Sequence, residues 1–528
     1  MVIINRIQKY FFNALILSVG SIIIHSISVT FNVFISDKVG AEAMGLFTLT
    51  SGVYSFAITL ATSGINLAVV RLVSAALPYK GKENASSGAT VKKIMVNALF
   101  YCLFFSSIAG ILLFFCAKPI SIYLLDDLRV IPSLKLMAIS LMPISISSML
   151  NGYFCAVRRV YKNIIVQFFE QGVKISLVVM LVTLIAPKGI GYACLSIALG
   201  GTISEIASLI LNVVLFFFDR KRHIIPNECD NASEKRMYNV FGCAFPVAVS
   251  AYVRSALSTI EHLAIPWGLK RNGLSASRAL ASYGVLHGMV FPLIFFPSSV
   301  LGAFSSLLVP EISSSYEARD TGRIKSIVEY VFSFSLLFSL GISGIFICFS
   351  NEIGTYFFKS AEAGELIRLI APLIPLMYLD YSVDAMLKGL GEHIYSMRIN
   401  IIDSLISVVL ILALVPHLGI KGYIIVIFVT ELFNTSMSIM RLLKKTELKP
   451  LLIKWVFKPT LCIIGATFLS RLIFNSELFY VLLSKIGLGK VSTVIEICLC
   501  ALFYIIFSRI SGSISKKEIS LAKSLIKP

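Results

Sequence analysis

The feature that most constrains this sequence is a series of apolar runs, most of them about 20 residues long. A helix needs about 20 apolar residues to cross a hydrocarbon core of about 30 Å. Hydrophobic residues make up 57% of the chain and charged residues only 14%, whereas soluble domains carry roughly 25% charged residues. Because every backbone polar group must be bonded internally in lipid, these runs predict an all-α polytopic membrane protein.

We expect about fourteen transmembrane helices from the number of such runs. The predicted spans are 11–35, 44–70, 94–117, 134–156, 163–186, 190–218, 238–265, 280–309, 327–350, 366–390, 397–415, 420–440, 455–474 and 491–508. The stretch 118–133 is predicted to be a loop because it contains Asp126, Asp127 and Arg129. The first run is too long for a signal-peptide core and no small-residue cleavage site follows it, so it is expected to remain as a span.

Basic residues favour one side of these spans. With the N-terminus placed in the cytoplasm and the loops assigned alternately, most of the 47 lysines and arginines fall in cytoplasmic segments. Examples are Lys80, Lys82, Arg158, Arg159 and Lys444. This bias follows the positive-inside rule, and it explains the net charge of +19 without nucleic-acid binding. We therefore expect both termini to lie in the cytoplasm.

Signatures of catalysis and of cofactor binding are absent from the sequence. The 10 cysteines form no C-x-x-C pair, and neither G-x-x-x-x-G-K-[ST] nor H-E-x-x-H occurs. The longest connections between spans have about 20 residues, which is too few for a soluble domain with its own core. We expect no catalytic residues, no structural metal, no cofactor and no enzymatic activity.

The chain contains an internal repeat. The segment that begins at Gly45 aligns with the one that begins at Gly284, and a second pair of segments ends at Glu170 and Asp403. Parallel repeats of this kind are typical of transporters that hold their substrate between the halves. The predicted domains are two pseudo-symmetric six-helix lobes, followed by two additional C-terminal helices with a cytoplasmic tail: 1–225, 226–447 and 448–528.

Ionisable side chains occur inside the predicted spans, where each costs about 2.5–3.5 kcal/mol on insertion scales. Such groups usually face a water-filled cavity or a charged partner. Asp380, Asp384 and Lys388 are spaced four apart on one helix face, and Glu170 and Lys174 have the same spacing. These residues are candidates for lining a substrate cavity, and the alternative is a structural pair near the membrane boundary.

Arg254 is the charge best suited to bind an anionic substrate, because it lies in mid-span and the nearest acid on its face, Glu261, is two turns away. The alternative is a structural ion pair with another helix. Further cavity candidates are an arginine that ends the second span, two histidines and an amide: Arg71, His25, His262 and Asn32. For Arg71 the alternative is a positive-inside anchor, and for the histidines it is ordinary packing.

A small coupling cation would need oxygen ligands inside the membrane. Asn400 and Asp403 lie three apart on the eleventh predicted span, and Glu431 lies on the twelfth. These three residues are the candidates for ion coupling, with Na⁺ and H⁺ both left open.

Three segments carry a resemblance to a known family. They begin VGAEAMGLFTL, FPVAVSAYVRS and LDYSVDAMLKG, and they span 39–74, 245–313 and 379–404. Here, and over nearly the whole chain, the sequence resembles the multidrug/oligosaccharidyl-lipid/polysaccharide (MOP) exporter superfamily, and within it a sporulation-associated branch related to lipid II flippases. The resemblance implies two six-helix lobes around a central cavity in the bacterial cytoplasmic membrane, with two C-terminal helices that help to form a groove for a lipid tail.

One departure from lipid II flippases concerns the first span. Those flippases carry essential arginines there, whereas this span contains His25 and Asn32 and no arginine. Binding of an anionic headgroup would therefore pass to Arg254, with help from Arg71.

The resemblance implies a flippase that moves an undecaprenyl-pyrophosphate-linked peptidoglycan precursor or oligosaccharide to the outer leaflet by alternating access, in spore cortex or cell-wall assembly. Its partners would be lipid II or another lipid-linked oligosaccharide, membrane lipids, Na⁺ or H⁺, and enzymes of cell-wall synthesis. One alternative is a cation-coupled multidrug antiporter of the same superfamily, against which the two extra helices argue. Another is a membrane glycosyltransferase or polymerase, against which the short loops argue.

Overall fold

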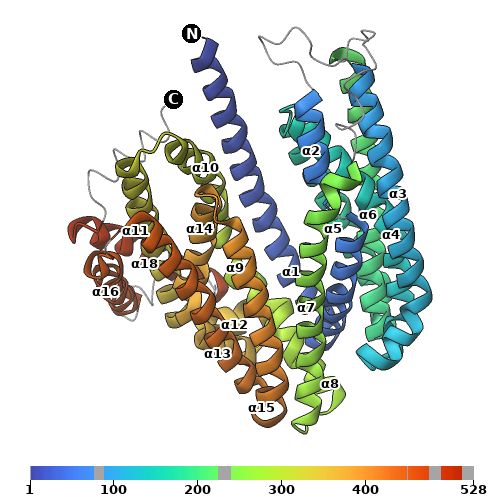
Figure 1. Ribbon diagram of the computed structural model, residues 1–528. Coiled ribbons are helices and arrows are strands. Elements are labelled where there is room, and N and C mark those ends of the chain that lie inside the picture. The colour runs from blue at the N-terminus through green and yellow to red at the C-terminus, as the bar shows by residue number, and fades with distance from the viewer. Residues whose placement is uncertain are drawn as a thin grey trace. The chain divides into compact units, whose positions relative to one another are not determined.

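The computed structural model describes residues 2–62, 64–76, 88–223, 240–448, 450–474 and 489–513. All regular elements in these ranges are helices (Figure 1), in agreement with the all-α class expected from the apolar runs. Of the five basic residues named as examples for the orientation, Lys80 and Lys82 lie outside the described residues, as does the end of the tail after residue 513.

Two long helices are each interrupted by a glycine. α1 (Val2–Thr62) breaks at Gly40, with φ 81° and ψ 170°, and α15 (His393–Thr446) breaks at Gly419, with φ 61° and ψ −139°. A positive φ is strained for residues with a Cβ atom but not for glycine. Each break falls between two predicted spans, so each long helix corresponds to a pair of them.

Eleven segments of the described chain are long and apolar enough to cross a membrane. Two of them, Gly20–Ala76 and His393–Thr446, contain the glycine breaks. The others are Val91–Leu125, Leu128–Ala156, Tyr161–Lys188, Ile190–Asp219, Ala276–Phe295, Thr321–Cys348, Ala361–Gly389, Ile453–Phe474 and Ser492–Ile510. The chain is thus a polytopic helical membrane protein, and the total of about fourteen spans stays a prediction.

The loop predicted around Asp126 and Asp127 is shorter in the structure. α3 (Gly88–Pro119) continues into a π-helical turn, Ile120–Leu125, and only the two aspartates separate it from the next helical turn, Leu128–Val130. The prediction of a loop over Ile120–Leu125 was wrong, because these residues are mostly apolar and extend the helix as far as the acidic pair.

The single span predicted over 280–309 is divided in the structure. The chain forms α8 (Ala276–Tyr283), a π-helical turn (Gly284–Val290), α9 (Phe291–Phe295) and α10 (Ser298–Glu317). Pro297 stands between α9 and α10, and proline removes a backbone donor from the helical ladder. The apolar run therefore predicted one helix where the structure has several, and Pro297 stands at one of the boundaries between them.

The backbone groups into two compact units. One unit is Lys38–Gly284, and the other combines Met1–Asp37 with Val285–Pro528. This grouping reflects spatial proximity rather than repetition, so the predicted lobes and the C-terminal addition stay a prediction. It does place the first part of α1 with the later half of the chain, and α7 (Val240–Arg271) with the earlier half.

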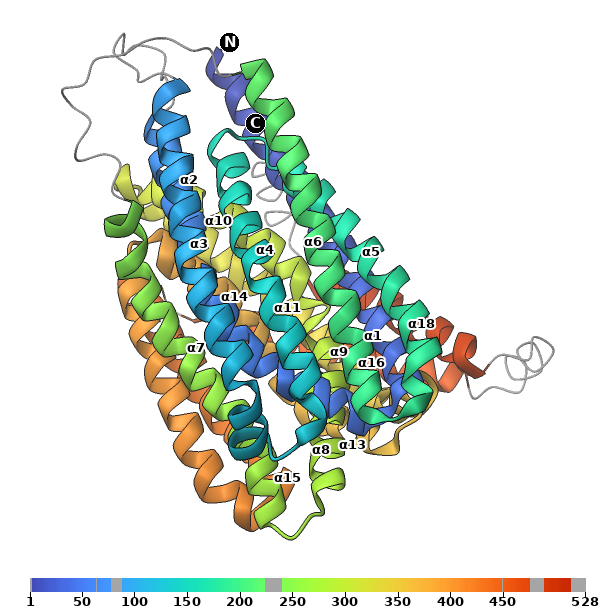
Figure 2. The same cartoon turned by 90° about the vertical axis from the view of Figure 1, so that its right-hand side faces the viewer.

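The unit Lys38–Gly284 is a bundle in which α3, α4 and α6 run side by side (Figure 2). The helices of this unit are the second part of α1, α2 (Ile65–Ala76), α3, α4 (Ile131–Ala156), α5 (Tyr161–Ile185), α6 (Ile190–His223), α7 and α8. The core forms where α2, α3 and α4 meet, and it includes the fully buried side chains of Val69, Ile94, Cys102, Tyr153 and Phe154.

The outward face of α3 is strongly apolar. Phe100, Phe104 and Phe115 have relative exposures of 68%, 61% and 74%, and they follow one another at helical spacing. A soluble protein rarely exposes such a contiguous apolar stripe, whereas lipid solvates it without penalty. The stripe therefore supports a membrane-embedded helix.

Two glycines bring the second part of α1 against the end of α8. A Cβ atom at Gly45 would lie 2.0 Å from the backbone oxygen of Leu280, and one at Gly284 would lie 2.2 Å from the backbone oxygen of Ala41. Neither position has room for a side chain, so the two backbones are in direct contact. Gly45 and Gly284 are also the aligned starting points of the predicted repeat.

The second unit packs α10, α11 (Thr321–Cys348), α14 (Ile374–Gly389) and α15 around an apolar core. Buried side chains at its centre include Val328, Val331, Val383, Met386 and Trp455. Two shorter helices, α12 (Ser350–Phe358) and α13 (Ala361–Ile370), connect α11 to α14.

The two C-terminal helices, α16 (Lys458–Phe474) and α18 (Gly489–Ile510), pack on each other and on α11 (Figure 1). Glycines on α11 allow this close approach. A Cβ atom at Gly344 would lie 2.2 Å from Ile463 Cγ1, and one at Gly341 would lie 2.5 Å from the Tyr504 ring. The Tyr504 hydroxyl also donates to the Leu337 carbonyl at 2.6 Å. The pair is thus fixed to α11 by direct packing.

Candidate functional site

The predicted site residues fall into two separate sets. Arg254, Glu261 and His262 lie on α7, Arg71 lies on α2, and Glu170 and Lys174 lie on α5, all within Lys38–Gly284. The other set belongs to the second unit: His25, Asn32, Asp380, Asp384, Lys388, Asn400, Asp403 and Glu431. Each set lies within its own unit, and a common cavity stays a prediction.

A polar pocket of about 210 Å³ lies between the second part of α1 and α7. Its lining consists almost wholly of hydroxyl-bearing residues with one imidazole: Thr48, Ser51, Gly52, Ser55, Ser255, Ser258, Thr259 and His262. Of the predicted residues, His262 lines the pocket. Arg254 does not line it, but it immediately precedes Ser255 on α7 and its side chain is exposed.

Hydrogen bonds across the pocket hold its walls in register. The Thr259 hydroxyl donates to the Ser255 carbonyl at 2.9 Å and to the Gly52 carbonyl at 3.2 Å. The Thr59 hydroxyl donates to the Ser255 hydroxyl at 3.1 Å. On the far side, His262 Nδ1 lies 2.9 Å from the Tyr283 hydroxyl. The pocket is therefore preformed by bonds that join α1, α7 and α8.

The hydroxyls of this pocket were not predicted from the sequence. A signal was present, because positions 48, 51, 52 and 55 on α1 and 255, 258, 259 and 262 on α7 each share one helical face. Serine and threonine in apolar helices usually bond their own backbone. Their spacing alone therefore does not show which hydroxyls face a pocket.

A second polar group joins α5 and α6 in the same unit. Glu205 on α6 lies within electrostatic range of Glu170 and Lys174 on α5, and Tyr54 interacts with both glutamates. Tyr54 also shares a hydroxyl–hydroxyl hydrogen bond with Ser140. Glu170 and Lys174, which were candidates for lining a cavity with a structural pair as the alternative, are therefore part of a larger group that contains two acids and one lysine.

In the second unit, the three charged residues predicted to share one face of α14 make two different sets of contacts. Asp384 accepts hydrogen bonds from Lys388 Nζ, at 2.5 Å, and from the Ser396 hydroxyl. Asp380 lies one turn earlier and interacts electrostatically with Glu431 of α15. Asp384 and Lys388 thus form the structural pair that was the alternative to a cavity lining, and Asp380 faces the acids of α15.

The residues predicted for ion coupling lie near one another on α15. Asp403 is within electrostatic range of Glu431, whose Oε1 accepts from the Thr435 hydroxyl at 3.0 Å. Asn400 Oδ1 accepts from Asn434 Nδ2 at 3.2 Å. Among the described residues, no group of three His, Cys, Asp or Glu side chains is arranged to hold a metal ion.

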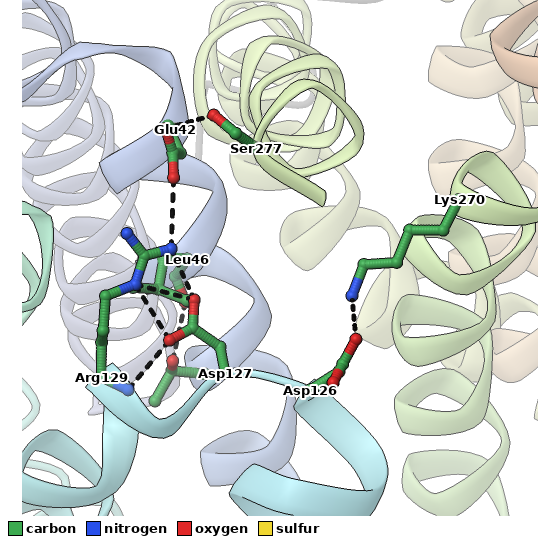
Figure 3. A network of polar contacts seen from close by, with 8 residues as sticks. Glu42, Leu46, Asp126, Asp127, Arg129, Lys270 and Ser277 are labelled. Atoms are coloured by element: carbon green, nitrogen blue, oxygen red, sulfur yellow. Dashed lines mark hydrogen bonds and ion pairs between the residues drawn. The ribbon is translucent and has the colours of Figure 1, made fainter. Parts of the chain in front are cut away.

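A network of ion pairs closes one end of the unit Lys38–Gly284 (Figure 3). Arg129 Nη2 pairs with Asp127 at 2.6 Å and with Glu42 Oε1 at 3.2 Å, and Glu42 Oε2 accepts from the Ser277 hydroxyl at 2.5 Å. Beside it, Lys270 Nζ pairs with the neighbouring Asp126 at 2.9 Å. These bonds tie α1, the connection after α3, the end of α7 and the start of α8 together.

Two family models match the sequence. The polysaccharide biosynthesis protein family matches residues 11–315, and the MatE family matches residues 272–412. Stage V sporulation protein B of Bacillus subtilis (strain 168) is 26% identical over 423 residues, which cover 79% of this chain and 80% of that protein.

Solved structures show the same fold. The lipid II flippase MurJ, in an inward closed conformation, matches with a TM-score of 0.66 at 14% identity over 97% of this chain and 99% of that one. A multidrug resistance MATE family transporter of the MOP superfamily, in an inward-facing conformation, matches with a TM-score of 0.62 at 15% identity over 81% and 98%. These proteins are a flippase and a transporter, and neither is an enzyme.

Proposed function

Because this chain belongs to the polysaccharide biosynthesis protein family of the MOP superfamily of membrane flippases and transporters, we propose that its cargo is a lipid-linked sugar. The cargo is an undecaprenyl-pyrophosphate-linked peptidoglycan precursor or oligosaccharide, and it moves from the inner to the outer leaflet by alternating access. The single observation that carries this proposal is an exposed arginine in the middle of α7, beside a hydroxyl-lined pocket.

The physical problem for such a protein is the charged headgroup. An unpaired pyrophosphate in hydrocarbon is prohibitive in free energy, whereas an arginine can bond it through charge-assisted hydrogen bonds. Arg254 forms no ion pair with any residue that the structure describes. An arginine inside a predicted span, without an ion-pair partner among the described residues, is well placed for an anionic substrate.

The named relatives support a role in the cell wall. One is a stage V sporulation protein and another is a lipid II flippase. We place this chain in spore cortex or cell-wall peptidoglycan assembly in the bacterial cytoplasmic membrane, with lipid II as the first substrate to test. Enzymes of cell-wall synthesis are the protein partners that this role implies.

The driving force is assigned to the acids of the second unit. Asp380, Asp403 and Glu431 lie within electrostatic range of one another or share a neighbour, and Asn400 lies on the same helix as the latter two. A cation or proton bound there would offset their mutual repulsion. Moving one charge through the membrane potential supplies about 2.3 kcal/mol per 100 mV. Na⁺ and H⁺ are both candidates.

The test is translocation by purified protein in vesicles, with fluorescent lipid II and a second lipid-linked oligosaccharide assayed side by side. Arg254→Ala should slow translocation at least tenfold because the pyrophosphate loses its counter-charge. Arg271→Ala is the matched control: Arg271 lies at the end of the same helix, where it stacks on Trp267 at 4.5 Å. Translocation by Arg254→Ala at the wild-type rate would contradict the assigned site.

A second candidate is cation-coupled export of drugs. The MatE match over residues 272–412 and the MATE-like fold favour it. The measurement is efflux of cationic dyes and antibiotics from cells or vesicles that contain the protein. Dye efflux that depends on an ion gradient, together with no movement of lipid-linked sugars, would replace the flippase proposal.

A further inference from the structure

Four hydroxyls in the pocket between α1 and α7 have no hydrogen-bond partner among the described residues. Within the described part of the chain, the side chains of Thr48, Ser51, Ser55 and Ser258 hydrogen-bond to no other protein group. Their pocket location leaves these hydroxyls accessible to a bound molecule.

Neighbouring hydroxyls on the same helix behave differently. Thr50, Thr59 and Thr62 each donate to the carbonyl one turn earlier, at 2.7–2.9 Å. That is the ordinary arrangement for threonine in an apolar helix. Thr48, Ser51 and Ser55, which line the pocket from α1, depart from this arrangement, because none of them donates to the carbonyl one turn earlier.

The lining selects for an uncharged polar ligand. No aspartate, glutamate, lysine or arginine lines the pocket. A phosphate would find no counter-charge there, although it would need one to leave water. Hydroxyls that both donate and accept hydrogen bonds suit a ligand that is itself rich in hydroxyl and amide groups.

The size of the pocket fits one sugar ring. A cavity of about 150 Å³ is known to hold benzene, and this pocket measures about 210 Å³. One six-membered ring with its ring substituents is therefore an appropriate occupant. A disaccharide would extend beyond the pocket.

The pocket also lies at a suitable distance from Arg254. With a rise of 1.5 Å per residue, Ser258 and His262 stand about 6 and 12 Å further along the axis of α7. A sugar ring attached to pyrophosphate could thus occupy the pocket while the phosphates reach the arginine. Both elements lie within Lys38–Gly284.

We propose that this pocket is the sugar subsite: the hydroxyls of Thr48, Ser51, Ser55 and Ser258 bind one uncharged ring of the lipid-linked substrate. This inference rests on the proposed function, and it assigns the sugar and the pyrophosphate of the substrate to two different groups of residues. Arg254 would bind the pyrophosphate irrespective of the sugar, and the pocket would recognise the sugar irrespective of the charge.

The test compares two probes bound to full-length protein in lipid nanodiscs: lipid II, and undecaprenyl pyrophosphate without a sugar. The variant T48V/S51A/S55A/S258A removes the four hydroxyls, and T62V/S176A removes two that only bond their own backbone. We expect the four-site variant to bind lipid II at least tenfold more weakly and to bind undecaprenyl pyrophosphate as the wild type does. The control should bind both probes normally.

The outcomes separate the two proposals. Equal binding of lipid II by the wild type and the four-site variant would overturn the sugar subsite and leave the flippase proposal standing. Binding of neither probe by the wild type would overturn both proposals. If the four-site variant does not fold, the nearly isosteric Thr48→Val variant decides, because it removes one hydroxyl with little change of side-chain shape. Selective loss of lipid II affinity supports the subsite, and unchanged affinity rejects it.

Discussion

At the scale of single residues, buried charges occur where several donors converge on one acid. Asp219 near the end of α6 has a side chain that is 2% exposed, and it accepts from Lys162 Nζ at 2.5 Å and from Arg159. The Tyr153 hydroxyl donates to the same carboxylate at 3.3 Å. A buried acid with this many donors can stay charged without a large penalty.

A second cluster of one acid and two bases lies in the second unit. Glu392, before α15, accepts from Arg441 and Lys445, each at 2.7 Å. In the predicted repeat Glu392 aligns with Arg159. Here the acid precedes α15 and both bases lie near its end, whereas Asp219 lies near the end of α6 and is paired with Arg159 before α5 and with Lys162 in the first turn of α5.

Glu392 gives a prediction for the pH dependence of stability. Hydrogen bonds from Lys445 and Arg441 hold the pKa of Glu392 below its usual value, which is about 4.3. A lowered folded-state pKa contributes stability above the unfolded-state pKa, and that contribution is lost as the pH falls through the lowered value. Acidification from pH 7 to about 3.5 should therefore lower the Tm of the wild type more than that of Glu392→Gln.

The measurement is thermal unfolding in detergent at a series of pH values. Glu365→Gln is the control, because Glu365 is an exposed carboxyl on α13, and its replacement should leave the pH profile of the wild type unchanged. An identical pH profile for Glu392→Gln and the wild type would show that the two bases contribute nothing through this carboxylate.

How far single residues could be assigned from the sequence depended on whether their partners were local. The pair of Asp384 and Lys388 was expected as one alternative because its spacing is helical. The separation of Asp380 from that pair depends on Glu431 and Ser396 of another helix, and spacing along α14 contains no information about them. The unbonded hydroxyls of the pocket were missed for the same reason.

At the scale of elements, glycine determines where helices approach and where they break. The apolar runs located the helices well, and Gly40 and Gly419 divide the two long ones where the sequence placed span boundaries. The run over 280–309 was less informative, because hydropathy does not register a π-helical turn or a proline between two helices. Backbone geometry, rather than apolarity, decides such details.

The attachment of α16 and α18 to α11 gives a prediction at this scale. Gly344→Val should lower the free energy of unfolding by about 1–3 kcal/mol, because the new side chain would overlap Ile463. Gly172→Val is the control, since a Cβ atom at Gly172 on α5 meets nothing within 4 Å. The measurement is chemical or thermal unfolding in detergent.

Protease sensitivity of the connection between α15 and α16 would report on the same contact. Cleavage should be faster in Gly344→Val than in Gly172→Val, because α16 would be held less firmly. Equal stability and equal cleavage of the two variants would contradict the close packing of Gly344 on Ile463.

At the scale of the whole molecule, the sequence predicts orientation as well as class. The apolar runs and the excess of basic residues in alternate loops predict that both termini lie in the cytoplasm, and this stays a prediction. The division of the backbone into two units could not be foreseen, since it depends on which helices pack together across long stretches of sequence. Hydropathy alone does not show which helices pack against one another.

Orientation can be tested by labelling cysteines with a membrane-impermeant maleimide. Tyr123 is 83% exposed near the acidic connection that follows α3, and Lys444 is an exposed residue in the last turn of α15. Tyr123→Cys should be labelled in intact cells, and Lys444→Cys only after permeabilisation. The unsubstituted protein supplies the background from its native cysteines, and the reverse labelling pattern would invert the topology.

The contact between Gly45 and Gly284 bears on how such a chain could have arisen. In a symmetric dimer, a residue meets its own copy only on the two-fold axis. If the two segments descend from one duplicated gene, their first glycines were once the same residue in two separate molecules. The contact between these two glycines would then derive from the two-fold contact of an ancestral homodimer. After fusion into one chain, the two copies would have diverged in sequence, while both glycines were kept because neither position has room for a side chain.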